Sequence, residues 1–133
     1  MKENINTQQA PSAIGPYSQA IRPGNLVFTS GQLPLIPETI QFPAGGIREQ
    51  TRQSLRNVKA ILESTGAGMD TIIKTTCFLA DMFHFSEFNE EYSTFFTTDI
   101  TPARSCVQAA RLPKDALVEV EVMSYVDENR ISA

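Results

Sequence analysis

The stretch Thr101-Pro102-Ala103-Arg104-Ser105-Cys106-Val107, followed by Leu112-Pro113-Lys114-Asp115-Ala116-Leu117-Val118-Glu119-Val120-Glu121, decides the fold expected for this chain. Pro102 favours extended backbone in the residue before it, and the alternation over residues 103–109 then predicts a strand. The second segment predicts another strand over residues 117–126, in which valines alternate with polar side chains. We expect these two strands to be neighbours in one sheet.

Arg104 is the clearest candidate for a functional residue in this region. It shares a strand face with Cys106 and Gln108, and a neighbouring strand would place it near Glu119 or Glu121, between which the pattern does not choose. The planar fork of a guanidinium matches a carboxylate, so Arg104 could anchor a small anionic substrate while a nearby glutamate orients a water molecule. A surface ion pair is the alternative interpretation of the same spacing.

The rest of the chain predicts an α+β fold, with two helices on one face of a mixed β-sheet. Helical periodicity, β-branched residues and turn residues indicate the further elements: a hairpin of Tyr17–Ile21 and Leu26–Ser30, a loop over Gln32–Gly46, an amphipathic helix over Ile47–Ser64, a strand over Thr71–Leu79 and a helix capped by Ser86. On that last helix, an aromatic stripe is typical of core packing and consists of Phe88, Tyr92, Phe95 and Phe96.

The sheet face opposite the helices carries too much apolar character to stay in water. The residues assigned to it are Leu26, Phe28, Cys77, Leu79 and Met123. Because one helix layer cannot cover both faces of a sheet, we expect further copies of the chain to cover this one.

Length and composition exclude several classes of protein. At 133 residues the chain has the size of a single domain, and we assign residues 1–133 to one. A net charge of -4 and a pI near 4.9 make nucleic acid an unlikely partner, because phosphate binding needs clustered lysine and arginine. Cys77 and Cys106 lie within expected strands, which favours reduced thiols and a cytoplasmic protein. No apolar run approaches the ~20 residues of a membrane span, so we expect no membrane insertion.

Several polar residues could carry chemistry, and each has a structural alternative. Ser30 and Gly31 end a strand, where a hydroxyl and a close backbone approach suit a ligand, or where the glycine simply turns the chain. Cys106 could be an activated nucleophile, but the one histidine that could serve as its base, His84, falls between an expected strand and an expected helix, which favours a pocket-lining role for Cys106. Tyr17 could offer its phenol to a ligand or serve packing.

Metal and nucleotide sites are not expected. His84 stands alone, and the two cysteines are too far apart in sequence for the closely spaced ligand pairs of a zinc site. The glycine-rich loops that bind nucleoside triphosphates or dinucleotides are absent from the sequence.

Six blocks of sequence match one known family along nearly the whole chain. They are Ala10–Gln19 (APSAIGPYSQ), Thr29–Pro34 (TSGQLP), Gln53–Ala60 (QSLRNVKA), Lys74–Phe78 (KTTCF), Pro102–Val107 (PARSCV) and Ala110–Glu119 (ARLPKDALVE). On these motifs the chain resembles the reactive intermediate (enamine/imine) deaminase A family, RidA for short, often labelled endoribonuclease L-PSP. The resemblance implies a chorismate-mutase-like α+β unit that forms homotrimers with active sites between subunits.

The resemblance also implies an activity and roles for the site residues. The activity is that of a 2-iminobutanoate/2-iminopropanoate deaminase, which hydrolyses 2-enamine and 2-imine acids to 2-keto acids and ammonia without a cofactor. Arg104 would hold the substrate carboxylate, helped by backbone N–H groups of Gly31 and Cys106. Glu119 would position the attacking water. Three further residues carry over as pocket residues: Tyr17, Ser30 and Asn89.

One departure from the family pattern lies in the loop. Family members commonly have a glycine-containing turn near Pro37-Glu38-Thr39, whereas Ile40-Gln41-Phe42 follows here, which leaves the loop conformation open. Two other functions remain as alternatives. A ribonuclease or translation inhibitor is disfavoured by the acidic charge and the single histidine, and a non-catalytic module that binds small acids would use the same pocket, so that turnover distinguishes it from the enzyme.

Overall fold

The structure is a computed structural model that describes residues 1–131. Its main elements, in chain order, are β1 (Lys2–Ile5), β2 (Ala20–Pro23), β3 (Leu26–Thr29), α1 (Ile47–Glu63), β4 (Ile72–Leu79), α2 (Phe85–Ser93), β5 (Ala103–Gln108) and β6 (Val118–Tyr125). Short helical segments join or follow them: η1 (Met69–Thr71), η2 (Met82–His84), η3 (Pro113–Asp115) and α3 (Glu128–Ile131). The α+β fold class is confirmed.

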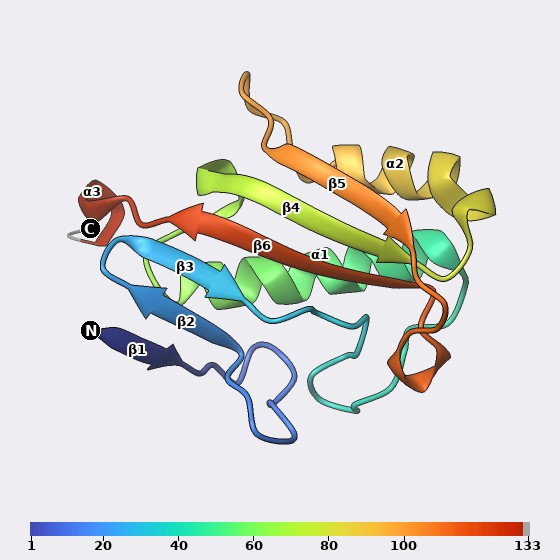
Figure 1. The fold of residues 1–133 in the computed structure, drawn as a ribbon, viewed down its shortest axis with the longest axis horizontal. Coiled ribbons are helices and arrows are strands. Elements are labelled where there is room, and N and C mark those ends of the chain that lie inside the picture. The colour runs from blue at the N-terminus through green and yellow to red at the C-terminus, as the bar shows by residue number, and fades with distance from the viewer. Residues whose placement is uncertain (132–133) are drawn as a thin grey trace.

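The strands form one mixed sheet in the order β1-β2-β3-β6-β4-β5 (Figure 1). β4 and β5 are parallel, with Cys77 opposite Cys106, and the other neighbouring strands are antiparallel. A parallel pair needs a crossover connection, and α2 supplies it. The expectation that the strands of Arg104 and Glu119 are neighbours is therefore wrong, because β4 lies between β5 and β6.

The predicted hairpin is confirmed, with a shorter first strand. β2 begins at Ala20, so Tyr17 lies in the loop before it, and Gly24 takes the left-handed φ of 65° that the turn to β3 requires. β1 pairs with the outer side of β2. Its side chains are mostly exposed, so the sequence carried no apolar alternation that would have predicted it.

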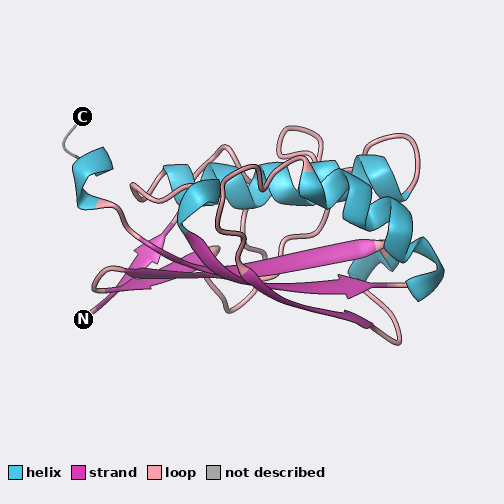
Figure 2. Cartoon of the chain, turned by 90° about the horizontal axis from the view of Figure 1, so that it is seen from above, coloured by secondary structure: helices cyan, strands magenta, loops and turns pink. Residues whose placement is uncertain are grey.

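Both helices cover the same face of the sheet, as predicted (Figure 2). The apolar stripe of α1 is completely buried against the valines of β6, and its members are Leu55, Val58, Ile61 and Leu62. Burying each such side chain contributes roughly 1.5–3 kcal/mol relative to leaving it exposed. α1 begins after Gly46, whose backbone N–H donates to the Glu49 carboxylate at 2.8 Å, and Gly66 follows its end with a φ of 91°.

α2 is shorter than the aromatic stripe predicts. The helix is preceded by His84 and starts at Phe85, so Ser86 lies inside it and does not cap it. Phe88 and Tyr92 are buried in the core, which confirms the interpretation of the stripe as core packing. Two of its members, Phe95 and Phe96, lie beyond the end of α2 at Ser93 but still pack against the core.

The other face of the sheet is partly apolar and exposed in the single chain. Side chains between 37% and 45% exposed gather on it, namely Leu26, Phe28, Met123 and Tyr125. Cys77 and Leu79 are instead fully buried on the helix side, so their assignment to the open face is wrong. The register explains the correction, because they lie opposite the core residues Val120 and Val118. The open face therefore carries a smaller apolar surface than expected, formed by these four exposed side chains.

The long loop after Gly31 has no helix or extended strand, as predicted. Asn57 of α1 fastens it by donating from Nδ2 to the carbonyls of Leu33 and Leu35, at 3.0 and 2.9 Å. At the departure from the family pattern, Ile40 takes a left-handed φ of 56°. A β-branched side chain is strained in that conformation, which glycine adopts freely. Across residues 1–131, no helix is long and apolar enough to cross a membrane.

Candidate functional site

Arg104 on β5 turns its side chain toward α2. Its Nη1 donates a hydrogen bond of 2.6 Å to Oδ1 of Asn89, and its guanidinium carbon lies 4.9 Å from the centre of the Tyr92 ring. The ring centres of Phe85 and Phe88 lie 5.6 and 5.9 Å from the same carbon. Within residues 1–131 no acidic side chain forms an ion pair with Arg104, so the surface ion pair considered above is not formed. The guanidinium is therefore positioned to accept an external anion.

Cys106 lies two residues further along β5, on the same side as Arg104. It is half-buried opposite Cys77 of β4. Burial raises the pKa of the Cys106 thiol, against a smaller opposing effect of Arg104, and burial raises the pKa of Cys77 to about 12. Both thiols are therefore protonated at neutral pH, which favours the pocket-lining role of Cys106 over the nucleophile.

Ser30, Gly31 and Glu119 form a second group, at the end of β3 and the start of β6. The Ser30 hydroxyl donates to the carbonyl of Ser18 at 2.6 Å, which fixes the start of the loop. Glu119 lies directly over Gly31, since a Cβ atom added to this glycine would be 2.8 Å from the carboxyl carbon Cδ. Position 31 therefore needs glycine for the close approach of Glu119, which decides against a simple turn residue.

Tyr17 directly precedes Ser18, whose carbonyl accepts the hydrogen bond from Ser30 of this second group. Its side chain is 54% exposed, and its backbone N–H donates to the carbonyl of Gly15 at 2.9 Å. The neighbouring segment is held by the buried amide of Gln19, which donates from Nε2 to the carbonyls of Ala10 and Pro11, at 3.3 and 2.8 Å. An exposed phenol on a fastened loop can reach a ligand, whereas a packing role would bury it.

The environment of Glu119 distinguishes it from Glu121. Burial, and to a smaller extent the charge of Glu121, raises the pKa of Glu119. A carboxylate with a raised pKa is a better proton acceptor. Glu121 lies on the same face of β6 but lines a separate depression of about 180 Å³ with Phe28 and Lys74. The contact with Gly31 and the raised pKa both favour Glu119 as the residue that could activate water.

The two groups lie on opposite faces of the sheet within one chain. Arg104 is opposite the buried Thr75 and contacts α2, so it faces the helix layer. Glu119 alternates with the core residues Val118 and Val120, so it faces the open side. The structure thus brings Arg104, Asn89 and Cys106 together and Glu119, Gly31 and Ser30 together, but it does not unite the two groups in one chain.

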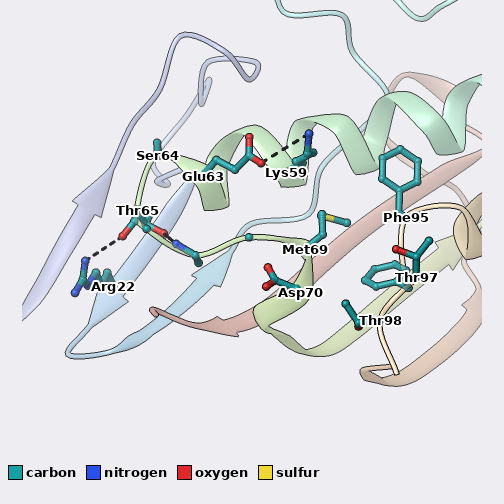
Figure 3. Close-up of a pocket in the computed structure, with 14 residues that line it drawn as sticks. Arg22, Lys59, Glu63, Ser64, Thr65, Met69, Asp70, Phe95, Thr97 and Thr98 are labelled. Carbon is teal, nitrogen blue, oxygen red and sulfur yellow. Dashed lines mark hydrogen bonds and ion pairs between the residues drawn. The ribbon is translucent and has the colours of Figure 1, made fainter. Parts of the chain in front are cut away.

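A further cavity lies away from both groups. It measures about 740 Å³ and opens between the end of α1 and the segment that follows α2 (Figure 3). In it Lys59 pairs with Glu63 at 3.7 Å, and Arg22 donates to the carbonyl of Thr65 at 3.3 Å. Its cationic groups are therefore engaged by neighbouring acceptors, and no residue expected in the active site lines it. No group of three or more His, Cys, Asp and Glu within residues 1–131 could hold a metal ion.

The sequence analysis missed the aromatic contacts of Arg104. Phe88 and Tyr92 were assigned to the core, which is confirmed, but both also lie near the guanidinium. The signal was available in the spacing, because Phe85, Asn89 and Tyr92 recur on one face of α2. The spacing alone does not show that α2 connects β4 to the strand of Arg104, and this connection is what brings that face of α2 to the guanidinium.

Comparison with known proteins agrees with the motifs and the fold. Residues 7–126 match the family described as Endoribonuclease L-PSP. A RutC family protein of Pyrococcus horikoshii is 49% identical over 94% of this chain and 98% of its own. The 2-iminobutanoate/2-iminopropanoate deaminase of Escherichia coli is 48% identical over 93% of this chain and 98% of its own.

A solved structure supports the same relationship. The crystal structure of Escherichia coli TdcF with bound serine has a TM-score of 0.89 and 46% identity, and the match covers 94% of this chain and 99% of that chain. These similarities extend over almost the full length of each protein. The chain belongs to the endoribonuclease L-PSP family.

Proposed function

We propose that the protein is a cofactor-independent deaminase that hydrolyses 2-imino acids, such as 2-iminobutanoate and 2-iminopropanoate, to 2-keto acids and ammonia. The observation that carries this proposal is Arg104, a guanidinium without an acidic partner in the described chain, held by Asn89 and Tyr92 at 2.6 and 4.9 Å. Such a group recognises a carboxylate, which every substrate of this class has. The similarity to a named imine deaminase supports the choice of substrate class.

The reaction needs few groups. A 2-enamine acid such as 2-aminoacrylate first tautomerises to its imine, and the Arg104 guanidinium holds the carboxylate in two hydrogen bonds. Glu119 accepts a proton from a water molecule as the oxygen attacks the electrophilic C2 carbon. The proton taken up by Glu119 passes to the imine nitrogen, which gives the carbinolamine. Transfer of the hydroxyl proton to the nitrogen then breaks the C–N bond, releasing ammonia and leaving the 2-keto acid. The backbone N–H groups of Gly31 and Cys106, with Tyr17 and Ser30, complete the pocket in this proposal.

We propose that one active site combines the two groups from different copies of the chain. Arg104 and Glu119 face opposite sides of the sheet in one chain, so a neighbour must bring the complementary group. The exposed apolar residues of the open face, such as Phe28 and Met123, support association there. In a head-to-tail arrangement each copy offers one group to the copy before it and the other group to the copy after it, and a ring forms where the rotation between copies closes. We take the number of copies to be three, as the family resemblance implies.

The proposed enzyme is a single domain, and the reaction takes place in the cytoplasm. Reduced thiols support this location, because neither Cys77 nor Cys106 forms a disulfide in the structure. The expected ligands are small 2-imino and 2-keto acids.

Release of 2-keto acid tests the proposal. A dehydratase would generate the enamine from serine or threonine in place, and keto-acid formation would be followed with and without the purified protein. We expect acceleration by the wild type and loss of most of it in Arg104→Lys, because lysine keeps the charge but lacks the planar fork. No acceleration by a folded wild-type protein would refute the deaminase. Near-normal turnover by Arg104→Lys would refute the anchoring role. RNA cleavage that survives Arg104→Ala through repeated chromatography would instead favour the ribonuclease.

A further inference from the structure

Tyr92 places a buried ring face beside the guanidinium of Arg104. Its ring centre is 4.9 Å from the guanidinium carbon, nearer than those of Phe85 and Phe88 at 5.6 and 5.9 Å. A cation within about 6 Å of an aromatic face is attracted by the electrons of the ring. Among the aromatic neighbours, Tyr92 is thus the one best placed to hold the guanidinium.

The Tyr92 ring is itself fixed on its other sides. Its hydroxyl forms a hydrogen bond of 2.9 Å with Oγ1 of Thr75, a completely buried residue opposite Arg104 in the sheet. The ring of Phe96 packs on it with centres 4.5 Å apart, and Tyr92 is only 9% exposed. Burial raises the pKa of the Tyr92 hydroxyl, which is therefore protonated and able to donate to Thr75. The ring cannot tilt without breaking these contacts.

The arrangement determines which edge of Arg104 remains for a ligand. Asn89 accepts a hydrogen bond from Nη1, and the guanidinium carbon lies over the Tyr92 ring. A free arginine side chain has many rotamers, and this conformational freedom is lost when the side chain binds a carboxylate in the bidentate geometry. Holding Arg104 in one orientation beforehand removes part of that cost.

We propose that Tyr92 is a positioning residue for carboxylate binding, acting through Arg104, with its hydroxyl fixed by Thr75. The inference rests on the proposed function, since it concerns the same anchor. It assigns to the ring a role beyond core packing. Tyr92 touches neither the substrate nor the attacking water, so its effect is on binding of the carboxylate.

Binding of 2-oxobutanoate, a reaction product of this class, tests the role without chemistry. In Tyr92→Leu we expect its dissociation constant to rise about tenfold. Tyr92→Phe keeps the ring, so its dissociation constant should rise only two- to threefold. Thr75→Val removes the hydrogen bond to the Tyr92 hydroxyl but preserves the shape of the side chain, so its dissociation constant should match that of Tyr92→Phe. Phe95→Leu is the matched control, because its ring packs against the core but stacks on neither Arg104 nor the Tyr92 ring, and this variant should bind as the wild type.

A double-mutant cycle with Arg104→Ala separates positioning from a general loss of packing. If Tyr92 acts through Arg104, Tyr92→Leu should weaken binding no further once the arginine is gone. Unchanged binding in Tyr92→Leu, or equal losses in the two backgrounds, would overturn the inference. If Tyr92→Leu does not fold, Tyr92→Phe and Thr75→Val decide in its place, and wild-type affinity in both would overturn the inference. No turnover by the folded wild type would refute the proposed function itself, and normal binding in Arg104→Ala would refute the anchoring role of the arginine. A requirement for Arg104 without one for Tyr92 refutes only this inference.

Discussion

Substitution of Gly31 by alanine should damage catalysis while leaving the fold nearly unchanged. The added Cβ would lie 2.8 Å from both Cδ and Oε2 of Glu119, whereas ordinary contacts begin at 3.4 Å. The carboxylate must therefore move by at least about 0.6 Å, the difference of these two distances. Misplacing a catalytic group by ~1 Å costs about 100-fold, so we expect kcat/KM to fall by about 10- to 100-fold.

The stability of Gly31→Ala should change by less than about 1 kcal/mol. The group that must give way is the end of a flexible, half-exposed side chain, and alanine lowers the entropy of the unfolded chain by a compensating ~0.4–1 kcal/mol. The assay is keto-acid release from an enamine generated in place, together with urea denaturation at one fixed protein concentration.

Two controls separate displacement of Glu119 from other effects of the added methyl group. Gly46→Ala adds a Cβ with no atom within 4 Å and should keep its turnover. In a Glu119→Gln background, Gly31→Ala should cause little further loss, because both changes act on one carboxylate. Wild-type turnover in Gly31→Ala would refute the placement of Glu119 in the active site.

Three further outcomes follow from the structure. Because burial, and then Glu121, raises the pKa of Glu119, that carboxyl contributes stability below its unfolded pKa of about 4.3 and loses it as the pH rises through the folded value. Glu119→Gln should therefore be more stable than the wild type at pH 7, and equal stabilities there in denaturant titrations would contradict the raised pKa. The same variant should keep only a small residual turnover, because the proton acceptor is gone. Cys106→Ala should retain activity within about threefold, because the thiol is protonated and water is the nucleophile, whereas a covalent adduct seen by mass spectrometry would contradict this. Ile40→Gly should raise the unfolding free energy by roughly 0.5–1 kcal/mol by relieving the left-handed φ of 56°, and a lower urea midpoint would show that the loop is not strained there.

Local patterns predicted most of the elements and their buried faces. The helix over residues 47–64 is observed as Ile47–Glu63, and the strand over residues 117–126 as Val118–Tyr125 with its valines in the core. These predictions succeed because periodicity reports which side chains leave water. The end of α2 was misplaced because Phe95 and Phe96 continue to pack on the core after the helix has ended, so burial and helical structure no longer coincide.

Strand order was beyond the reach of these patterns. Alternation within the strands of Arg104 and Glu119 says nothing about which strand lies between them, and β4 takes that place because α2 returns the chain in parallel. Alternation identified Arg104 and Glu119 as polar members of their strands, but the expected contact of these two strands within one chain is wrong. The motifs marked residues that the structure places in two separate groups, and the open sheet face supports the proposal that a second chain joins them.

Subunit complementation tests the central claim, that Arg104 and Glu119 of different chains make one active site. Arg104→Ala and Glu119→Gln proteins, each nearly inactive, would be mixed in equal amounts and allowed to exchange subunits. If each site takes Arg104 from one copy and Glu119 from its neighbour, about one quarter of the sites are intact by random assembly. A mixture of Arg104→Ala with Asn89→Ala is the control, because both changes fall in the same group.

The readout is keto-acid release before and after exchange, with exchange itself verified by native mass spectrometry of two differently tagged variants. We predict that the Arg104→Ala and Glu119→Gln mixture recovers about one quarter of wild-type activity, and that the control mixture stays at the level of its separate components. Mixed oligomers that remain inactive with Arg104→Ala and Glu119→Gln, despite proven exchange, would contradict a site shared between two chains.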